Sequence, residues 1–207
     1  MQLAINTLMK KIIALLIILL PLLGFGRTDS NAQYIHKKLL RATAGFSPGI
    51  MTQQKITNIY IIGNLEYYIH RKISLRGESY YFLNTINSNK PFVLNHKIFA
   101  GTNYHFRTNN HLDPYIGIHP GAAITQTLHL PVACVGFCPQ NFTEPTKSSV
   151  STNPLFSVSA GINYYFQKLF HLYADVKYNY GKHLSDMPTP QSLSEFNFTF
   201  GLGWNLF

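Results

Sequence analysis

The chain has 207 residues and a formal net charge of +9, with 46% hydrophobic residues but only 12% charged ones. This length forms one domain of ordinary size and requires no second one. A basic chain often binds nucleic acid, but the N-terminal segment argues against that partner.

The N-terminal segment has the features of a secretory signal peptide. Lys10 and Lys11 precede the apolar run Ile12–Leu23, and small residues follow at positions 30–32. The run is shorter than the roughly 20 apolar residues that a transmembrane helix needs, and no later segment approaches that length. Helices are therefore not expected to span a membrane in this chain.

We expect residues 1–32 to be a signal peptide and residues 33–207 to form the mature domain. Removing the leader leaves 14 basic and 7 acidic residues, a net charge of +7 with neutral His. Because an exported chain is separated from nucleic acid, we expect no nucleic-acid partner. Anionic lipid headgroups and the phosphates of lipopolysaccharide are better matched to this charge.

The first expected strand runs from His36 to Phe46 and is followed by a loop to about Ile56. The segment Ile59–Leu83 then alternates with period two on both sides of the break His70-Arg71-Lys72, which predicts a β-hairpin with a tight polar turn. One face of the hairpin is aliphatic and aromatic, whereas its charged residues share the other face. A sheet that is apolar outside and polar inside indicates a barrel in a lipid bilayer.

Five further segments alternate in the same way and are expected to be strands. They are Leu94–Phe106, Pro114–Ile124, Phe156–Phe166, His171–Tyr180 and Glu195–Leu206. Pro120 predicts an edge or a bulge in its strand, and residues 125–154 read as a long loop with four prolines. Thirteen Tyr, fifteen Phe and one Trp fit aromatic girdles at two membrane interfaces better than a soluble core.

The predicted fold class is all-β, a closed eight-stranded antiparallel up-and-down transmembrane β-barrel. Closure follows because lipid cannot satisfy an open sheet edge. The expected connections alternate between short and long, as the periplasmic turns and extracellular loops of outer-membrane barrels do. We therefore expect a location in the outer membrane of a Gram-negative cell.

Extending the strand register places four cations and four carboxylates on the inward face. They are Arg41, Arg76, Lys97 and Lys177 with Glu66, Glu78, Asp175 and Glu195. A narrow lumen that excludes most water requires such neutralisation, and eight strands leave room for side chains only. We expect a plugged interior without a large pore.

The sequence resembles the small outer-membrane β-barrel proteins of the OmpA-like transmembrane type over nearly all of Ala42–Phe207. The resemblance rests on the segments Gly63–Tyr68, Leu75–Glu78, Pro114–Gly117 with Pro120-Gly121, Tyr178–Gly181 and Gly201–Phe207. It implies the barrel fold and gives little information about activity.

Cys134 and Cys138 are the only cysteines and lie in the longest expected loop of an exported chain. A local disulfide is therefore predicted between them, with free thiols as the alternative. Only His129 lies nearby as a further metal ligand, so we expect neither a metal site nor a cofactor.

One constellation has catalytic potential. His183-Leu184-Ser185-Asp186 followed by Glu195 looks like the His-x-Ser-Asn element of outer-membrane lipid A deacylases. In that element His, Ser and a later Glu are base, nucleophile and orienting acid. Asp186 replaces the amide, and the register points His183, Ser185 and Glu195 into the lumen and away from lipid, so we favour a solvated loop without catalysis.

Three function classes follow from these observations. The favoured one is a non-enzymatic barrel with a structural or surface-interaction role, monomeric, whose loop 125–154 contacts an extracellular ligand or a host surface. The second is a lipid A hydrolase. The third, a soluble lipocalin-like barrel, requires an apolar interior, which the inward charges contradict.

Overall fold

The computed structural model describes residues 35–86, 90–106, 111–129, 146–184 and 191–206, without the side chains of His129 and Thr146. These residues form a closed barrel of eight long strands and one two-residue strand, β6 (Thr146–Lys147). The long strands are β1 (Leu40–Met51), β2 (Thr57–His70), β3 (Ile73–Thr85), β4 (Phe92–His105), β5 (Leu112–His129), β7 (Ser151–Tyr165), β8 (Phe170–Gly181) and β9 (Glu195–Asn205). No helix within the described ranges is long and apolar enough to cross a membrane.

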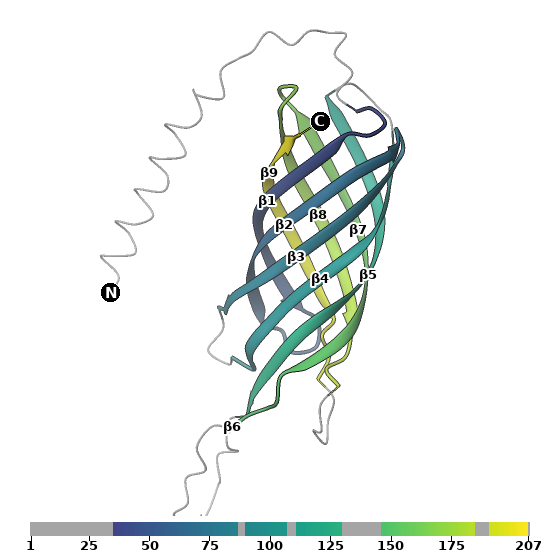
Figure 1. The fold of residues 1–207 in the computed structure, drawn as a ribbon. Helices are drawn as coiled ribbons and strands as arrows, with labels where there is room; N and C mark the ends of the chain where they lie inside the picture. The colour runs from purple at the N-terminus through teal and green to yellow at the C-terminus, as the bar shows by residue number, and fades with distance from the viewer. Residues whose placement is uncertain (1–34, 87–89, 107–110, 130–145, 185–190, 207) are drawn as a thin grey trace, which may run out of the picture. The chain divides into compact units, whose positions relative to one another are not determined.

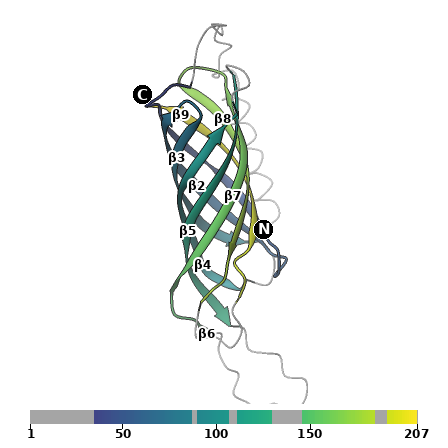
Figure 2. The same ribbon diagram turned by 90° about the vertical axis from the view of Figure 1, so that its right-hand side faces the viewer.

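Every long strand pairs antiparallel with its neighbours along the chain, and β1 pairs with β9 to close the cylinder (Figures 1 and 2). The predicted closed, eight-stranded, up-and-down topology is therefore confirmed. Closure leaves every long strand hydrogen-bonded on both sides, so the barrel has no exposed sheet edge along its wall.

The two ends of the barrel differ in their connections. At one end, which we call the turn end, β1 begins, β9 finishes and short connections join β2 to β3, β4 to β5 and β7 to β8. The other end, the loop end, carries β6 and the connections that follow β1, β3, β5 and β8 (Figure 1). Residues 71–72 form the shortest turn, between β2 and β3.

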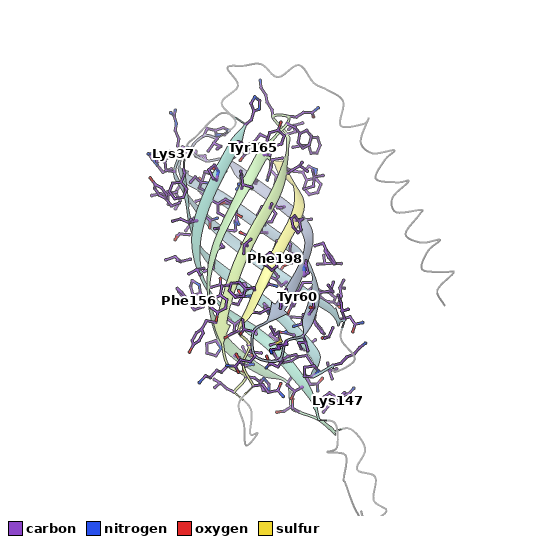
Figure 3. All side chains as sticks on the ribbon, turned by 180° about the vertical axis from the view of Figure 1, so that it is seen from behind. Lys37, Tyr60, Lys147, Phe156, Tyr165 and Phe198 are labelled. Carbon is purple, nitrogen blue, oxygen red and sulfur yellow. The ribbon has the colours of Figure 1, made fainter. Side chains whose placement is uncertain are left out.

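Side chains alternate between the lumen and the outer surface along most of each long strand. In β3 the burial pattern switches at each residue from Ile73 to Leu83, as a strand with one enclosed face requires. The outward positions are predominantly aliphatic or aromatic on all eight long strands, with a few polar residues such as Ser79, Thr102 and Thr152 among them, and Figure 3 shows Phe156 projecting from the wall. The predicted polarity, apolar outside and mostly polar inside, is confirmed by this pattern.

The largest differences from the predicted strand boundaries are three. β1 continues through Ser47-Pro48-Gly49 to Met51, and residues 125–129 and 151–154 of the expected long loop are strand. The prediction was wrong because Pro and Gly were read as turn signals, whereas an established ladder tolerates one missing N–H donor per proline.

The bulge predicted at Pro120 is absent. β5 and β7 remain in register from Leu112 opposite Tyr164 to Thr125 opposite Ser151, with Pro120 opposite Phe156.

The longer β1 also weakens the expected alternation of connection lengths. Residues 52–56 now join β1 to β2, and the β4–β5 turn spans residues 106–111.

The lumen contains an apolar cluster towards the loop end, which the sequence analysis did not anticipate. Phe82 and Phe92 contribute from β3 and β4, while Ile56 and Leu193 come from the connections that fold over the opening. The cluster includes Met51, Ile56, Ile62, Phe82, Phe92, Phe99, Ala123, Leu155 and Leu193, each at most 8% exposed. In this half of the barrel, hydrophobic packing therefore stands beside buried polar side chains such as Asn58, Lys97 and Asn197.

Candidate functional site

A ladder of alternating charge crosses the lumen near the turn end. Arg41 on β1 lies opposite Glu66 on β2, which lies opposite Arg76 on β3. Both guanidinium groups contact Oε2 of Glu66, Arg76 through Nη2 at 2.9 Å. The strand register places these opposite charges on directly paired positions. The three side chains therefore neutralise one another between neighbouring strands, without having to extend across the barrel.

Asp113 and His105 extend this ladder across the lumen. Nη1 of Arg41 donates to Oδ2 of Asp113 at 3.2 Å. His105 lies between two carboxylates, with Nδ1 2.8 Å from Oδ1 of Asp113 and Nε2 3.2 Å from Oε1 of Glu66. Since an ionised carboxylate only accepts hydrogen bonds, both contacts are satisfied together when both ring nitrogens carry protons.

A second group of charges lies beside the ladder. Lys177 forms an ion pair with Glu78, which also accepts from Nη1 of Arg76 at 3.3 Å. Tyr115 links Arg76 to Asp175, because its hydroxyl accepts from Nη1 at 2.9 Å and donates to Oδ2 at 2.7 Å. The Arg76 guanidinium also stacks over the Tyr115 ring at 4.4 Å, a cation–π geometry.

The remaining ion pair lies towards the loop end. Lys97 contacts Oε2 of Glu195, and Tyr60 and Asn58 donate to the same carboxylate at distances of 2.9 to 3.1 Å. Both charged side chains are at most 1% exposed. A buried ion pair of this kind requires hydrogen bonds to its other lone pairs, and the tyrosine and amide supply them.

The structure thus brings together all eight charged residues that the sequence places in the lumen. Arg76 joins the ladder to the second group, and the Lys97–Glu195 pair lies apart from them. Asp113 is the charge that sequence reasoning missed, because the predicted strand began one residue later, at Pro114. Tyr115 faces the lumen, and extending the alternation of β5 back by two residues would have placed Asp113 there as well. With His105 doubly protonated, five cations balance five carboxylates among the described inward residues.

One set of lumen contacts has the connectivity of a hydrolase triad. Oγ of Ser74 lies 2.9 Å from Nε2 of His105, whose Nδ1 faces Asp113. However, the Ser74 hydroxyl also contacts the Glu66 carboxylate, and Ser74 is fully buried in the lumen. Because its hydroxyl is buried and bonded to Glu66, we group Ser74 with the buried charge network.

His183 and Glu195 have different hydrogen-bonding partners. Nδ1 of His183 lies 2.6 Å from the Thr125 hydroxyl and 3.1 Å from the Ser151 hydroxyl, whereas Glu195 contacts Lys97. Both residues are buried. Ser185 and Asp186 lie outside the described residues, so the contacts of the candidate nucleophile are not defined.

The two cysteines, Cys134 and Cys138, also lie outside the described residues, and their disulfide stays a prediction. No group of three or more metal-ligating side chains is present within the part of the chain that the structure describes. The arrangement of charges in the lumen is accordingly that of a paired, buried network.

The fold matches several solved barrels at low sequence identity. The outer membrane protein OprG from Pseudomonas aeruginosa gives a TM-score of 0.60 at 10% identity, covering 84% of this chain and 99% of that one. Neisserial surface protein A gives 0.59 at 15% identity, covering 81% and 96%. The N-terminal β-barrel domain of Pseudomonas aeruginosa OprF gives 0.56 at 14% identity, covering 82% and 98%.

No protein-family model matches the sequence, and no curated protein sequence matches it. The identities to the solved structures are low enough that the likeness carries the fold and not the activity. The chain is a closed, eight-stranded, antiparallel up-and-down β-barrel with the fold of the small outer-membrane barrel proteins.

Proposed function

We propose that the protein is an integral outer-membrane barrel that has a structural or surface-interaction role and a plugged lumen. The observation that carries the proposal is the continuous apolar outer surface. Ile61, Leu75, Ile116 and Phe200 are all about half exposed or more, and every long strand contributes such residues. Soluble monomers rarely expose contiguous apolar patches larger than a few hundred Å², so lipid is the environment that fits this wall.

Two kinds of packing support a plugged lumen. The ladder around Glu66 packs paired, buried side chains into the turn half, and the apolar cluster around Phe82 and Leu193 packs with buried polar side chains in the loop half. An eight-stranded barrel is just wide enough for its own side chains. We therefore infer that the protein conducts neither ions nor small solutes at a porin-like rate.

The absence of catalysis is part of the proposal. His183 is buried and hydrogen-bonded to Thr125, and Glu195 is held by Lys97 and Tyr60 inside the barrel. A lipid A deacylase needs its base and its acid at a site that opens to the bilayer. The inward positions of both side chains support a structural role for them.

The loop end is the side that we propose to contact an extracellular ligand, a host surface or lipopolysaccharide. Because β5 and β7 are longer than expected, the segment that joins them reduces to residues 130–150, which include β6. Proteolysis of intact cells tests this placement, since the segment should be cut before the barrel strands are.

A heat-modifiability gel on the purified outer-membrane fraction tests the main proposal, because a folded barrel migrates differently from the boiled chain. The same protein, reconstituted into vesicles, should leave small solutes trapped. Its expression should also leave the lipid A mass spectrum unchanged, both for the wild type and for Ser185→Ala. Rapid solute release would overturn the plugged lumen, and loss of an acyl chain only with the wild type would establish the hydrolase instead.

A further inference from the structure

The charges of the described residues are divided sharply between the inside and the outside of the barrel. All five described carboxylates lie in the lumen, with side chains at most 2% exposed. The exposed charged side chains in the same ranges are Lys37, Lys38, Lys55, Arg71, Lys72, Lys90, Lys147, Lys168 and Lys182, all of them basic. The described outer surface therefore carries charge of one sign only.

Five of these cations lie at the turn end, Lys168 in the β7–β8 connection and the other four where two adjacent segments meet. We call Lys37, Lys38, Arg71 and Lys72 the turn-end patch. N–H of Lys38 donates to the carbonyl of Tyr68 at 2.8 Å, which places the first pair beside the β2–β3 turn that holds the second. Figure 3 shows Lys37 at the opposite end of the barrel from Lys147. At the loop end the cations come singly, from separate connections.

An aromatic band lies on the outer wall just inside this patch. Tyr67, Tyr104, Tyr164 and Trp204 are outward and 37% to 46% exposed, and each lies near the turn end of its strand. Aromatic side chains of this kind take the headgroup level of a bilayer. The patch extends beyond the band along the barrel, which is the depth of the lipid phosphates.

We propose that the turn-end patch binds the anionic headgroups of phospholipids in the leaflet at that end of the barrel. The proposal rests on the proposed membrane function. Short turns of outer-membrane barrels face the periplasm, so the adjoining leaflet is the phospholipid leaflet. Clustered Lys and Arg next to a membrane-spanning segment attract anionic lipids, whose local concentration each cation raises by up to about fivefold.

Trp204 supplies a native reporter of the lipids around the patch. It is the only tryptophan, faces outward and lies opposite Ala42 of β1 and Phe170 of β8 at the turn end. The full-length protein is reconstituted into phosphatidylcholine vesicles that contain a minor fraction of phosphatidylglycerol. A spin-label quencher is attached to either lipid in matched samples. We expect stronger Trp204 quenching when the label is on phosphatidylglycerol.

The test variant neutralises the patch with Lys37→Gln, Lys38→Asn, Arg71→Gln and Lys72→Gln. Asn is chosen because Lys38 has a φ of 73°, a left-handed conformation that Asn adopts more readily than Lys. The matched control removes four charges at the loop end by Lys55→Asn, Lys90→Gln, Lys147→Gln and Lys182→Gln. Lys55 has a φ of 53°, so its replacement follows the same logic.

In the patch variant the excess quenching should fall by a factor of about three or more. In the loop-end control it should stay unchanged. Excess quenching that survives in the patch variant, or that falls equally in the control, overturns the proposal. Glycerol phosphate added in solution distinguishes a site for free phosphate from a contact with lipid headgroups. It would reduce the excess quenching if the patch bound soluble phosphate, and it would leave the quenching unchanged if the patch contacts the leaflet. If the protein inserts into the vesicles of neither labelled sample, the proposed function is overturned, and the patch proposal falls with it.

Discussion

Gly45 on β1 and Gly201 on β9 lie opposite each other across the pair of strands that closes the barrel. A Cβ on Gly45 would lie 2.3 Å from the carbonyl oxygen of Phe200, and one on Gly201 would lie 2.4 Å from that of Ala44. These contacts are with backbone, which cannot swing aside as a side chain can. The closure of the cylinder therefore depends on two glycines that the chain separates by most of its length.

The first prediction concerns this closing pair. Gly45→Ala should lower the free energy of unfolding by about 1 to 3 kcal/mol, because the added methyl group overlaps the β9 backbone. Gly77→Ala is the control, since a Cβ there meets nothing within 4 Å and should change stability by less than about 1 kcal/mol. Urea unfolding in lipid vesicles measures both, and equal effects would contradict the packing at the seam.

The second prediction concerns the buried pair of Lys97 and Glu195. Lys97→Met should cost about 3 to 5 kcal/mol, because it leaves the Glu195 carboxylate buried without its cation. Glu195→Gln should cost a similar amount by leaving the ammonium unpaired. The double variant should be less destabilised than the sum of the two, and a double-mutant cycle measures the difference. Strict additivity would show that the pair does not interact.

The third prediction tests the lipid-facing wall. Val176 is outward and 45% exposed near the middle of β8, so Val176→Arg should cost about 2 to 4 kcal/mol in a membrane. Thr152 is also outward but lies at the loop end of β7, and Thr152→Arg should cost at most about 1 kcal/mol. Folding titrations into vesicles compare the two positions, and the same cost at both would remove the depth assignment.

The fourth prediction is a pH effect at the mouth of the barrel. Burial lowers the pKa of His183 below its ordinary value, and its Nδ1 lies 2.6 Å from the Thr125 hydroxyl. When the pKa of a histidine is lower in the folded state than in the unfolded chain, its full contribution to folding stability is present at pH values above the pKa of the unfolded chain. That stability is lost as the pH falls below about 6.5.

Amide hydrogen exchange measures this opening. N–H of His183 donates to the carbonyl of Gln191 at 2.7 Å, and N–H of Leu193 donates to that of Gly181 at 2.9 Å. After correction for the intrinsic exchange rate, both amides should exchange faster at about pH 5.5 than at about pH 7.5. The variant His183→Gln should lose this pH dependence. An unchanged dependence in the variant would assign the effect to another group.

The sequence by itself determined the fold class and the facing of most side chains. Period-two alternation assigns a residue such as Arg41 or Lys177 to the lumen without any knowledge of its neighbours, because successive strand residues point to opposite faces. The apolar outward positions then indicate that the outer wall faces lipid and not water. Closure of the barrel follows because the edge strands of a sheet in lipid must pair with each other. These inferences use only information that is local to each strand.

Tertiary structure decided which inward residues meet. The shift of register between neighbouring strands sets the height of each side chain in the barrel, and no single strand encodes it. This register places Asp113 beside Arg41 and Lys97 beside Glu195, which is 98 residues away. It also gathers Phe82, Phe92 and other apolar side chains at one end of the lumen. Prolines and glycines misled the sequence reading because a ladder held on both sides retains its register through them.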